Sequence, residues 1–299
     1  MEENTKKVYL FLMATAILWG ANPIAVKSVL GEMTPTMIVL VRFLGISLIL
    51  LAIMLLKEKE TVFPPKQHVL TLILMGFTGV VINNGMQFTG LKYSTAINCV
   101  LVSALTPAMT ALMAGMFLKE RLNMRQWMGV LISMGGVVFL VAHGSMDVIK
   151  QLAFNKGDLL FLGGQSGWAI YTLLGRKVLR DMSPMATTAW SGMAGAAFMG
   201  AAALFEEQSG VGALGGLSMI YMIVGSGILA FTWWNLGVAA VGPNQASIFL
   251  NVIPLAGILL SVILLHEHIG WLECIGGAGI LLGVYLTARK IGDSGAQAA

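Results

Sequence analysis

Residues 91–144 read LKYSTAINCVLVSALTPAMTALMAGMFLKERLNMRQWMGVLISMGGVVFLVAHG, and the chain contains this stretch twice in recognisable form. A shift of 147 positions aligns four markers, with apolar runs in register between them: Pro107 with Pro254, Glu120 with Glu267, Gly129 with Gly276 and Gly136 with Gly283. Shared composition alone does not align prolines and glutamates in the same order. The pattern therefore indicates an internal duplication.

The duplication extends upstream with a slightly different offset. A shift of 149 pairs Trp19 with Trp168 and Lys27 with Arg176, and it places Met33-Thr34-Pro35 on Met182-Ser183-Pro184. We therefore expect two related halves, at residues 1–145 and 146–290, followed by a disordered tail at 291–299.

The composition is that of an integral membrane protein. Hydrophobic residues make up 57% of the chain and charged residues 11%, with a mean hydropathy of +0.83. Soluble domains carry about 25% charged residues. The net charge of +4 does not indicate nucleic-acid binding, because the basic residues lie in short loops. Cys99 and Cys274 lie in apolar runs without the spacing of a disulfide framework or a metal motif.

Ten apolar segments are long enough to cross a bilayer, which takes roughly 20 residues. The first continues past Trp19 without a small-residue cleavage site, so we interpret it as a retained span rather than a signal peptide. The predicted spans are residues 8–28, 35–56, 69–90, 95–118, 124–142, 158–178, 184–205, 215–236, 243–265 and 271–288.

The basic residues predict how these spans are oriented. With both termini in the cytoplasm, thirteen lysines and arginines fall on the inner side and four on the outer side, as the positive-inside rule requires. Five spans return the chain on the opposite side, so the second half must be inverted. We therefore expect an all-α membrane protein of ten transmembrane helices, arranged as two inverted five-helix repeats around a central cavity. Alternating-access carriers have this architecture.

Short motifs add a family resemblance. They are Trp19-Gly20 with Pro23, Arg42, Tyr93-Ser94-Thr95-Ala96 before Pro107, Leu118-Lys119-Glu120-Arg121, and Gly135-Gly136. With the second-half counterparts, the chain resembles the ten-span EamA-type exporters of the drug/metabolite transporter superfamily over roughly residues 8–290. This resemblance implies export or exchange of small metabolites, such as amino acids, their analogues or drugs. The superfamily also includes sugar and nucleotide-sugar carriers.

Polar side chains within the predicted spans are candidates for lining a cavity, because they are costly in hydrocarbon. Asn83, Asn84 and Gln87 end the third span, and Asn83 and Gln87 share one helical face. Their amides offer both donors and acceptors to a solute. The alternative is that they join helices to one another.

Aromatic residues predict the walls of the same cavity. Trp19 precedes Asn22 and Pro23, a proline that favours a kink and a freed carbonyl. We expect Trp19 to face its copy Trp168 across the pseudo-axis, with Tyr171 beside it. The alternative is an interfacial aromatic belt.

Weaker candidates lie in the fourth, eighth and ninth spans. They are Trp234 and Asn235, for which a belt position competes, and Asn98 and Asn251 beside the matched prolines. Pro107 and Pro254 are candidate hinges, or static kinks.

Arg42 is the one permanent charge well inside a span. Three roles are open to it: binding an anionic group, pairing with backbone carbonyls, or snorkelling to the membrane interface. Lys27 and Arg176 are predicted as interfacial anchors, and Glu120 and Glu267 as members of solvated ion pairs at helix ends, beside basic or histidine neighbours.

The sequence thus predicts a secondary transporter that exports or exchanges small metabolites by alternating access. No Asp or Glu lies in the middle of a span, so proton coupling through a central acid is not expected. The alternatives are a sugar or nucleotide-sugar carrier and a facilitative channel.

An intramembrane enzyme is disfavoured, because His266-Glu267-His268 lacks the HExxH spacing and no GxSxG occurs. We expect no cofactor, no metal and no nucleic-acid partner. The expected partners are a small solute and the lipid of a cell (inner) membrane. Small-residue faces in the fifth and tenth spans pack internally or form a homodimer.

Overall fold

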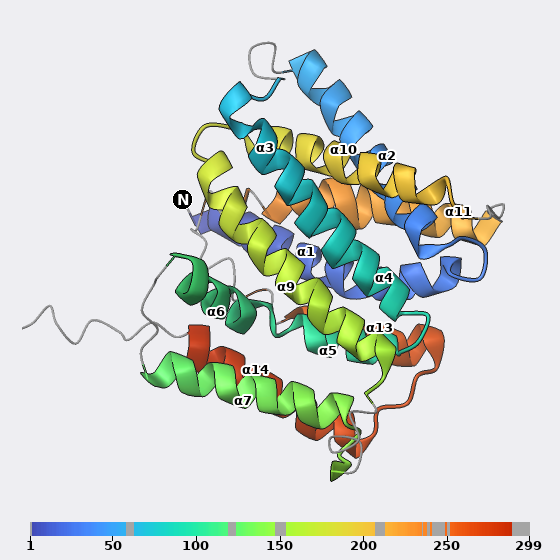
Figure 1. Ribbon diagram of the computed structural model, residues 1–299, viewed down its shortest axis with the longest axis vertical. Helices are drawn as coiled ribbons and strands as arrows, with labels where there is room; N and C mark the ends of the chain where they lie inside the picture. Colours follow the sequence, from blue (N-terminus) through green and yellow to red (C-terminus); the bar gives the residue numbers. More distant parts are fainter. Residues whose placement is uncertain are drawn as a thin grey trace, which may run out of the picture.

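The computed structural model describes residues 2–57, 63–118, 124–146, 154–206, 213–234, 236, 237, 240, 249 and 252–288. Within these residues every regular element is a helix (Figure 1). The elements are α1 (Glu2–Val29), α2 (Pro35–Lys57), α3 (Lys66–Met75), η1 (Gly76–Gly85), α4 (Met86–Gly90), α5 (Ala96–Ser103), α6 (Thr106–Leu118), α7 (Met124–Val141), α9 (Lys156–Val178), α10 (Pro184–Ala203), α11 (Ala213–Ile220), η2 (Tyr221–Leu229), α13 (Val252–Leu265) and α14 (Trp271–Ala288).

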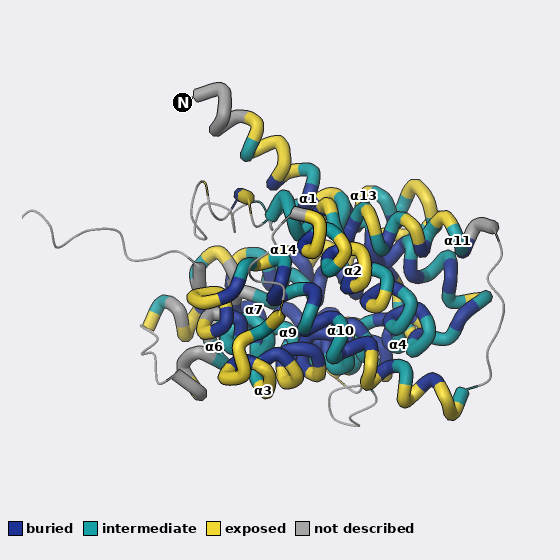
Figure 2. The backbone as a smooth tube through the Cα atoms, turned by 90° about the horizontal axis from the view of Figure 1, so that it is seen from above, coloured by how far each residue is buried: buried dark blue, intermediate teal, exposed yellow. Residues whose placement is uncertain are grey.

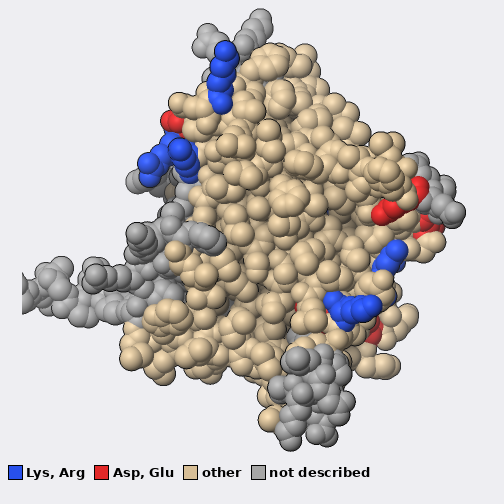
Figure 3. All heavy atoms as spheres, viewed as in Figure 1, with Lys and Arg blue, Asp and Glu red and all other residues tan. Residues whose placement is uncertain are grey.

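The helices have the length and apolar character that are typical of a membrane protein. Four of the described segments are long and apolar enough to cross a bilayer: Lys7–Val29, Pro35–Leu56, Lys66–Gly90 and Gly215–Trp234. Shorter apolar helices occur at Trp127–Leu140, Val252–Leu265 and Trp271–Gly283. Figure 3 shows charged side chains at two opposite sides of one face, with an uncharged expanse between them. Figure 2 shows the buried residues enclosed by the outer helices.

Two of the long segments change their helical winding partway along. Residues 66–90 run through α3, η1 and α4, and η1 is a π-helix. Residues 215–234 contain a second π-helix, η2. The π-helices begin at Gly76 and Tyr221, 145 positions apart, so they lie within a few residues of corresponding places in the two halves. π-Helical turns are rare and frequently occur at functional sites.

The predicted span at 95–118 is divided by a turn at residues 104–105, which separates α5 from α6. Pro107 has no N–H to donate to the carbonyl of Ser103, four residues earlier. The hydroxyl of Thr106 donates to that carbonyl instead, at 2.6 Å. The predicted hinge Pro107 therefore lies directly after a real interruption.

The other two predicted hinge prolines occupy different settings. Pro23 lies inside α1, which continues from Glu2 to Val29 without a break. Pro254 is buried in the first turn of α13. Residues 243–248, 250 and 251 of the predicted ninth span, and the predicted disordered tail at 291–299, lie outside the described residues.

Helices α7 and α14 lie side by side at the lower edge of Figure 1 and pack through small residues. A methyl group on Gly136 would lie 2.8 Å from the carbonyl oxygen of Gly276. Reciprocally, one on Gly283 would collide with the carbonyl oxygen of Gly129. The small-residue faces therefore bring these two backbones together within one chain.

Candidate functional site

One arginine lies buried among neutral polar side chains, well inside helix α2. Only 4% of Arg42 is exposed. Its Nη1 donates to Asn84 Oδ1 in η1 at 3.0 Å, and its Nη2 donates to Ser226 Oγ in η2 at 3.3 Å. The guanidinium therefore joins the two π-helical segments, one from each half of the chain. Such burial excludes snorkelling to the interface.

Ser226 extends this contact to the first helix. Its hydroxyl donates to Asn22 Oδ1 at 2.9 Å, and its backbone carbonyl accepts a 3.0 Å bond from the indole Nε1 of Trp19. Ser226 is fully buried. A single serine thus connects three residues that the sequence singled out.

The two asparagines of η1 complete the arrangement. Asn84 Nδ2 donates to Gly79 O at 2.8 Å and to Asn83 Oδ1 at 3.2 Å, which turns the Asn84 carbonyl oxygen toward Arg42. Asn83 Nδ2 donates to Gly164 O in α9 at 2.9 Å. We call Asn22, Arg42, Asn83, Asn84 and Ser226 the central polar cluster.

A second group of polar side chains fills the break between α5 and α6. Gln87 and Gln165 both donate to Ser103 Oγ, at 3.1 and 3.0 Å, and Thr106 donates to Gln165 Oε1 at 2.7 Å. Backbone groups at an interrupted helix need polar partners. The Thr106 hydroxyl is one, because it also bonds to the Ser103 carbonyl, and the other side chains bond to one another around it. Gln87 therefore lies in a separate hydrogen-bond group from Asn83 and Asn84.

The predicted aromatic residues form two separate groups. Trp19 packs on Phe231 and Trp234, with ring centroids 5.4 and 5.7 Å apart. Trp168 stacks on Tyr171 at 5.0 Å. Among the described residues no ring contact joins Trp19 to Trp168, although the sequence predicts that they face each other.

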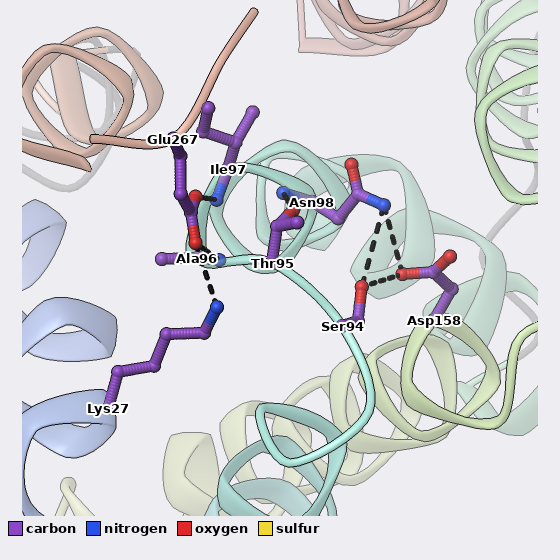
Figure 4. A network of polar contacts seen from close by, with 8 residues as sticks. All are labelled: Lys27, Ser94, Thr95, Ala96, Ile97, Asn98, Asp158 and Glu267. Atoms are coloured by element: carbon purple, nitrogen blue, oxygen red, sulfur yellow. Dashed lines mark hydrogen bonds and ion pairs between the residues drawn. The ribbon is translucent and has the colours of Figure 1, made fainter. Parts of the chain in front are cut away.

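Figure 4 shows a polar network at one end of the helices. Glu267, after α13, accepts hydrogen bonds from the backbone N–H groups of Ala96 and Ile97, both at 3.0 Å, and pairs with Lys27 Nζ at 2.8 Å. Its carboxylate therefore satisfies two free donors at the start of α5 and complements the helix dipole. The predicted ion pairing of Glu267 is confirmed, with Lys27 as its partner, but the prediction that this carboxylate is solvated is wrong, because its side chain is only 11% exposed.

A second acid joins the same end of the molecule. Asp158, in the first turn of α9, is buried. Its Oδ1 accepts from Ser94 Oγ at 2.5 Å and from Asn98 Nδ2 at 3.2 Å. Asn98 thus lies here rather than in the central polar cluster. We call Lys27, Ser94, Asn98, Asp158 and Glu267 the end network.

Sequence reasoning missed Ser226, Gln165, Asp158 and the role of Glu267. Ser226 is a lone serine in an apolar run, and nothing in its neighbours marks it. Asn235 and Asn251 lie outside the described residues. In the part of the chain that the structure describes, no group of three His, Cys, Asp or Glu side chains is placed to hold a metal ion.

A known family matches almost the entire chain. The model of the EamA-like transporter family matches residues 6–142 and 155–289. The chain belongs to the EamA-like transporter family. It is accordingly a membrane transporter, as the resemblance in the sequence implied.

Similar proteins agree with this assignment. The chain is 28% identical over 290 residues to the uncharacterized transporter YyaM of Bacillus subtilis (strain 168), covering 95% of this chain and 94% of that protein. It is 24% identical over 277 residues to the uncharacterized inner membrane transporter YedA of Escherichia coli (strain K12), covering 92% and 88%. A solved crystal structure with 20% sequence identity has the same fold, with a TM-score of 0.66 over 94% of this EamA-like chain and 97% of the other.

Proposed function

We propose that this EamA-like transporter is a secondary carrier that moves small metabolites across the inner membrane by alternating access. In this proposal ten spans form two inverted five-helix halves, at residues 1–145 and 146–290, and both termini are cytoplasmic. The central polar cluster binds the solute. The observation that carries the proposal is the bridge from Arg42 and Asn84 of the first half to Ser226 of the second, buried between apolar helices.

Matched contacts between the halves support the inverted arrangement. The π-helices η1 and η2 lie within a few residues of corresponding positions, and each supplies a partner of Arg42. Gly136 meets Gly276 while its repeat partner Gly283 meets Gly129, which is the reciprocity that a pseudo-two-fold axis produces.

The end network supplies a closure on one side of the site. It connects α1, α5, α9 and the segment after α13, so both halves of the chain contribute to it. A hollow of about 650 Å³ lies beside it, lined by Lys27, Leu30, Gly31, Leu91, Lys92, Leu265 and Glu267. In the proposed orientation this end faces outward, and a carrier must break these contacts to open there.

The test is counterflow in liposomes containing the purified protein. Vesicles are loaded with an unlabelled solute and diluted into a trace of the radiolabelled form, across a panel of amino acids, sugars and cationic drugs. A carrier accumulates label transiently above equilibrium, and the initial rate saturates with concentration. Flux that rises linearly without saturation would indicate a channel, and a chemically altered solute would indicate an enzyme. Protein-free liposomes are the control.

A further inference from the structure

We propose that Arg42 binds the carboxylate of the transported solute, so that the substrates are small monoanions or zwitterions rather than amines or neutral sugars. This inference rests on the proposed carrier function and assigns a substrate class to the same site.

The first reason is that the charge of Arg42 has no counter-charge in the part of the chain that the structure describes. The residue is 4% exposed, and no Asp or Glu of the described residues forms an ion pair with it. Its two side-chain partners, Asn84 and Ser226, are neutral. An ionised group within a membrane protein is costly and marks a functional site by default. A bound monoanion neutralises this charge.

The second reason is that the guanidinium keeps unused donors. Arginine carries five N–H donors in a planar fork. One bond from each terminal nitrogen is taken within the protein, and Nε, which is buried, has no acceptor among the described residues. A carboxylate accepts two parallel N–H bonds from such a fork, and this geometry selects it over a single neutral acceptor.

The surroundings hold the guanidinium in place. Its Cζ lies 5.4 Å from the ring centre of Phe43 and 5.6 Å from that of Phe88. The amide nitrogen of Asn84 donates to Gly79 O and to Asn83 Oδ1, and the Ser226 hydroxyl donates to Asn22 Oδ1, so these neighbours of Arg42 are themselves held in place. Arg42 is therefore the sole charge in the central polar cluster, where the low dielectric strengthens its attraction for an anion.

A single positive charge favours a monoanion. A dianion such as a phosphate monoester would leave one negative charge uncompensated in an apolar interior, at the same cost that Arg42 now bears. A protonated amine that carries no carboxylate would meet a like charge with nothing to offset it, whereas the carboxylate of a zwitterion can pair with Arg42 while its ammonium lies farther from the guanidinium. The substrate class follows from this charge balance.

The experiment uses three probes on one carbon skeleton: leucine, 4-methylpentanoate, which lacks the amino group, and isoamylamine, which lacks the carboxylate. Equivalent sets with alanine and phenylalanine skeletons cover solute size. Each probe competes in counterflow and is tested for thermal stabilisation of the detergent-purified protein. Arg42→Gln and Arg42→Lys are compared with the wild type.

We expect the probes that carry a carboxylate, leucine and 4-methylpentanoate among them, to compete in counterflow and to stabilise the wild type. We expect the amines that lack a carboxylate, such as isoamylamine, to do neither. Arg42→Gln should weaken acid binding by roughly 10- to 100-fold, the range for a lost charged hydrogen bond, and Arg42→Lys should weaken it less. Equal loss for acids and amines in Arg42→Gln, or amines competing as well as acids in the wild type, overturns the proposal. If Arg42→Gln does not fold, the wild-type preference between acid and amine decides alone. Saturable transport of amines only would leave the carrier function intact and refute this assignment, whereas absence of saturable transport for every solute refutes the carrier function itself.

Discussion

At the scale of single residues, the centre of this protein is held by hydrogen bonds between neutral groups and one arginine. Asn84 has the most demanding position, because its oxygen accepts from Arg42 while its amide nitrogen donates to Gly79 O and Asn83 Oδ1. Removing one partner of a buried polar group leaves the other unsatisfied, which costs about 1 to 3 kcal/mol.

We therefore expect Asn84→Leu to lower transport at least tenfold while the protein still reaches the membrane. The physical reason is that the Arg42 guanidinium loses an acceptor and its orientation. The matched control is Thr188→Val, because Thr188 is only partly buried and, among the described residues, its hydroxyl bonds to the Pro184 carbonyl of its own helix. Initial counterflow rates at equal membrane abundance are the measurement. Normal kinetics in Asn84→Leu would remove Asn84 from the site.

The sequence singled out the polar residues that cluster within one span, such as Asn83 and Asn84, and it singled out Arg42 while leaving open whether this side chain turns inward or snorkels. It could not predict Ser226, because a serine in an apolar helix ordinarily bonds to the carbonyl four residues earlier. Ser226 does make that bond, to Met222 at 3.3 Å, and its further contacts depend on three helices distant in sequence.

At the scale of elements, α5 depends on a residue from the other half of the chain. This helix has eight residues, and short helices are marginal without tertiary support. Thr95 caps Asn98 N–H, while Glu267 caps the Ala96 and Ile97 N–H groups. The native Cys99, buried in the same helix, reports on whether this end opens.

In a Cys274→Ser background, we expect Glu267→Gln to raise the rate at which an impermeant thiol reagent modifies Cys99. The substitution removes the charge that pairs with Lys27 and caps α5. The loss of these charged hydrogen bonds should destabilise the closed end by about 1 to 3 kcal/mol. That corresponds to roughly a 5- to 100-fold rise in the fraction of molecules in which Cys99 is accessible. Glu273→Gln is the control, because Glu273 is at the exposed start of α14 and bonds to Gly270 N–H. An unchanged Cys99 rate would show that Glu267 does not hold this end closed.

Two neighbouring glycines in α7 test the packing of α7 on α14. Gly136→Ala should lower the melting temperature of the purified protein, because the new methyl group would meet the backbone of Gly276 and Ile280. Gly135→Ala should leave it unchanged or raise it, because nothing lies within 4 Å of a methyl group there and alanine favours the helix by about 0.5 to 1 kcal/mol. Equal effects of the two substitutions would contradict the close backbone approach.

At this scale the helices were the most predictable feature, because apolar runs of span length leave few alternatives. The π-helical turns were not predicted, whereas the break at residues 104–105 lies beside Pro107, which the sequence marks as a candidate hinge or kink. A π-helical turn differs from an α-helix by one hydrogen-bond step, and side-chain periodicity over a uniformly apolar run does not register it.

At the scale of the whole molecule, both halves of the chain contribute residues to the proposed site and to its proposed closure. The end network joins α1 and α5 of the first half to α9 and Glu267 of the second. If the halves are inverted, the end network closes only one side of the site. Opening on that side then requires breaking the contacts of the end network. Alternating access in this account follows from that geometry.

Substituted-cysteine labelling from the two sides of the membrane tests the inverted arrangement most directly. In a chain with Cys99 and Cys274 replaced, single cysteines are introduced at exposed Met124 and His268, which start α7 and precede α14. If the repeats are inverted, His268→Cys reacts with an impermeant maleimide only in intact cells, and Met124→Cys reacts only in inside-out vesicles. Labelling of both positions from the same side would contradict the inverted repeat, and with it the carrier mechanism.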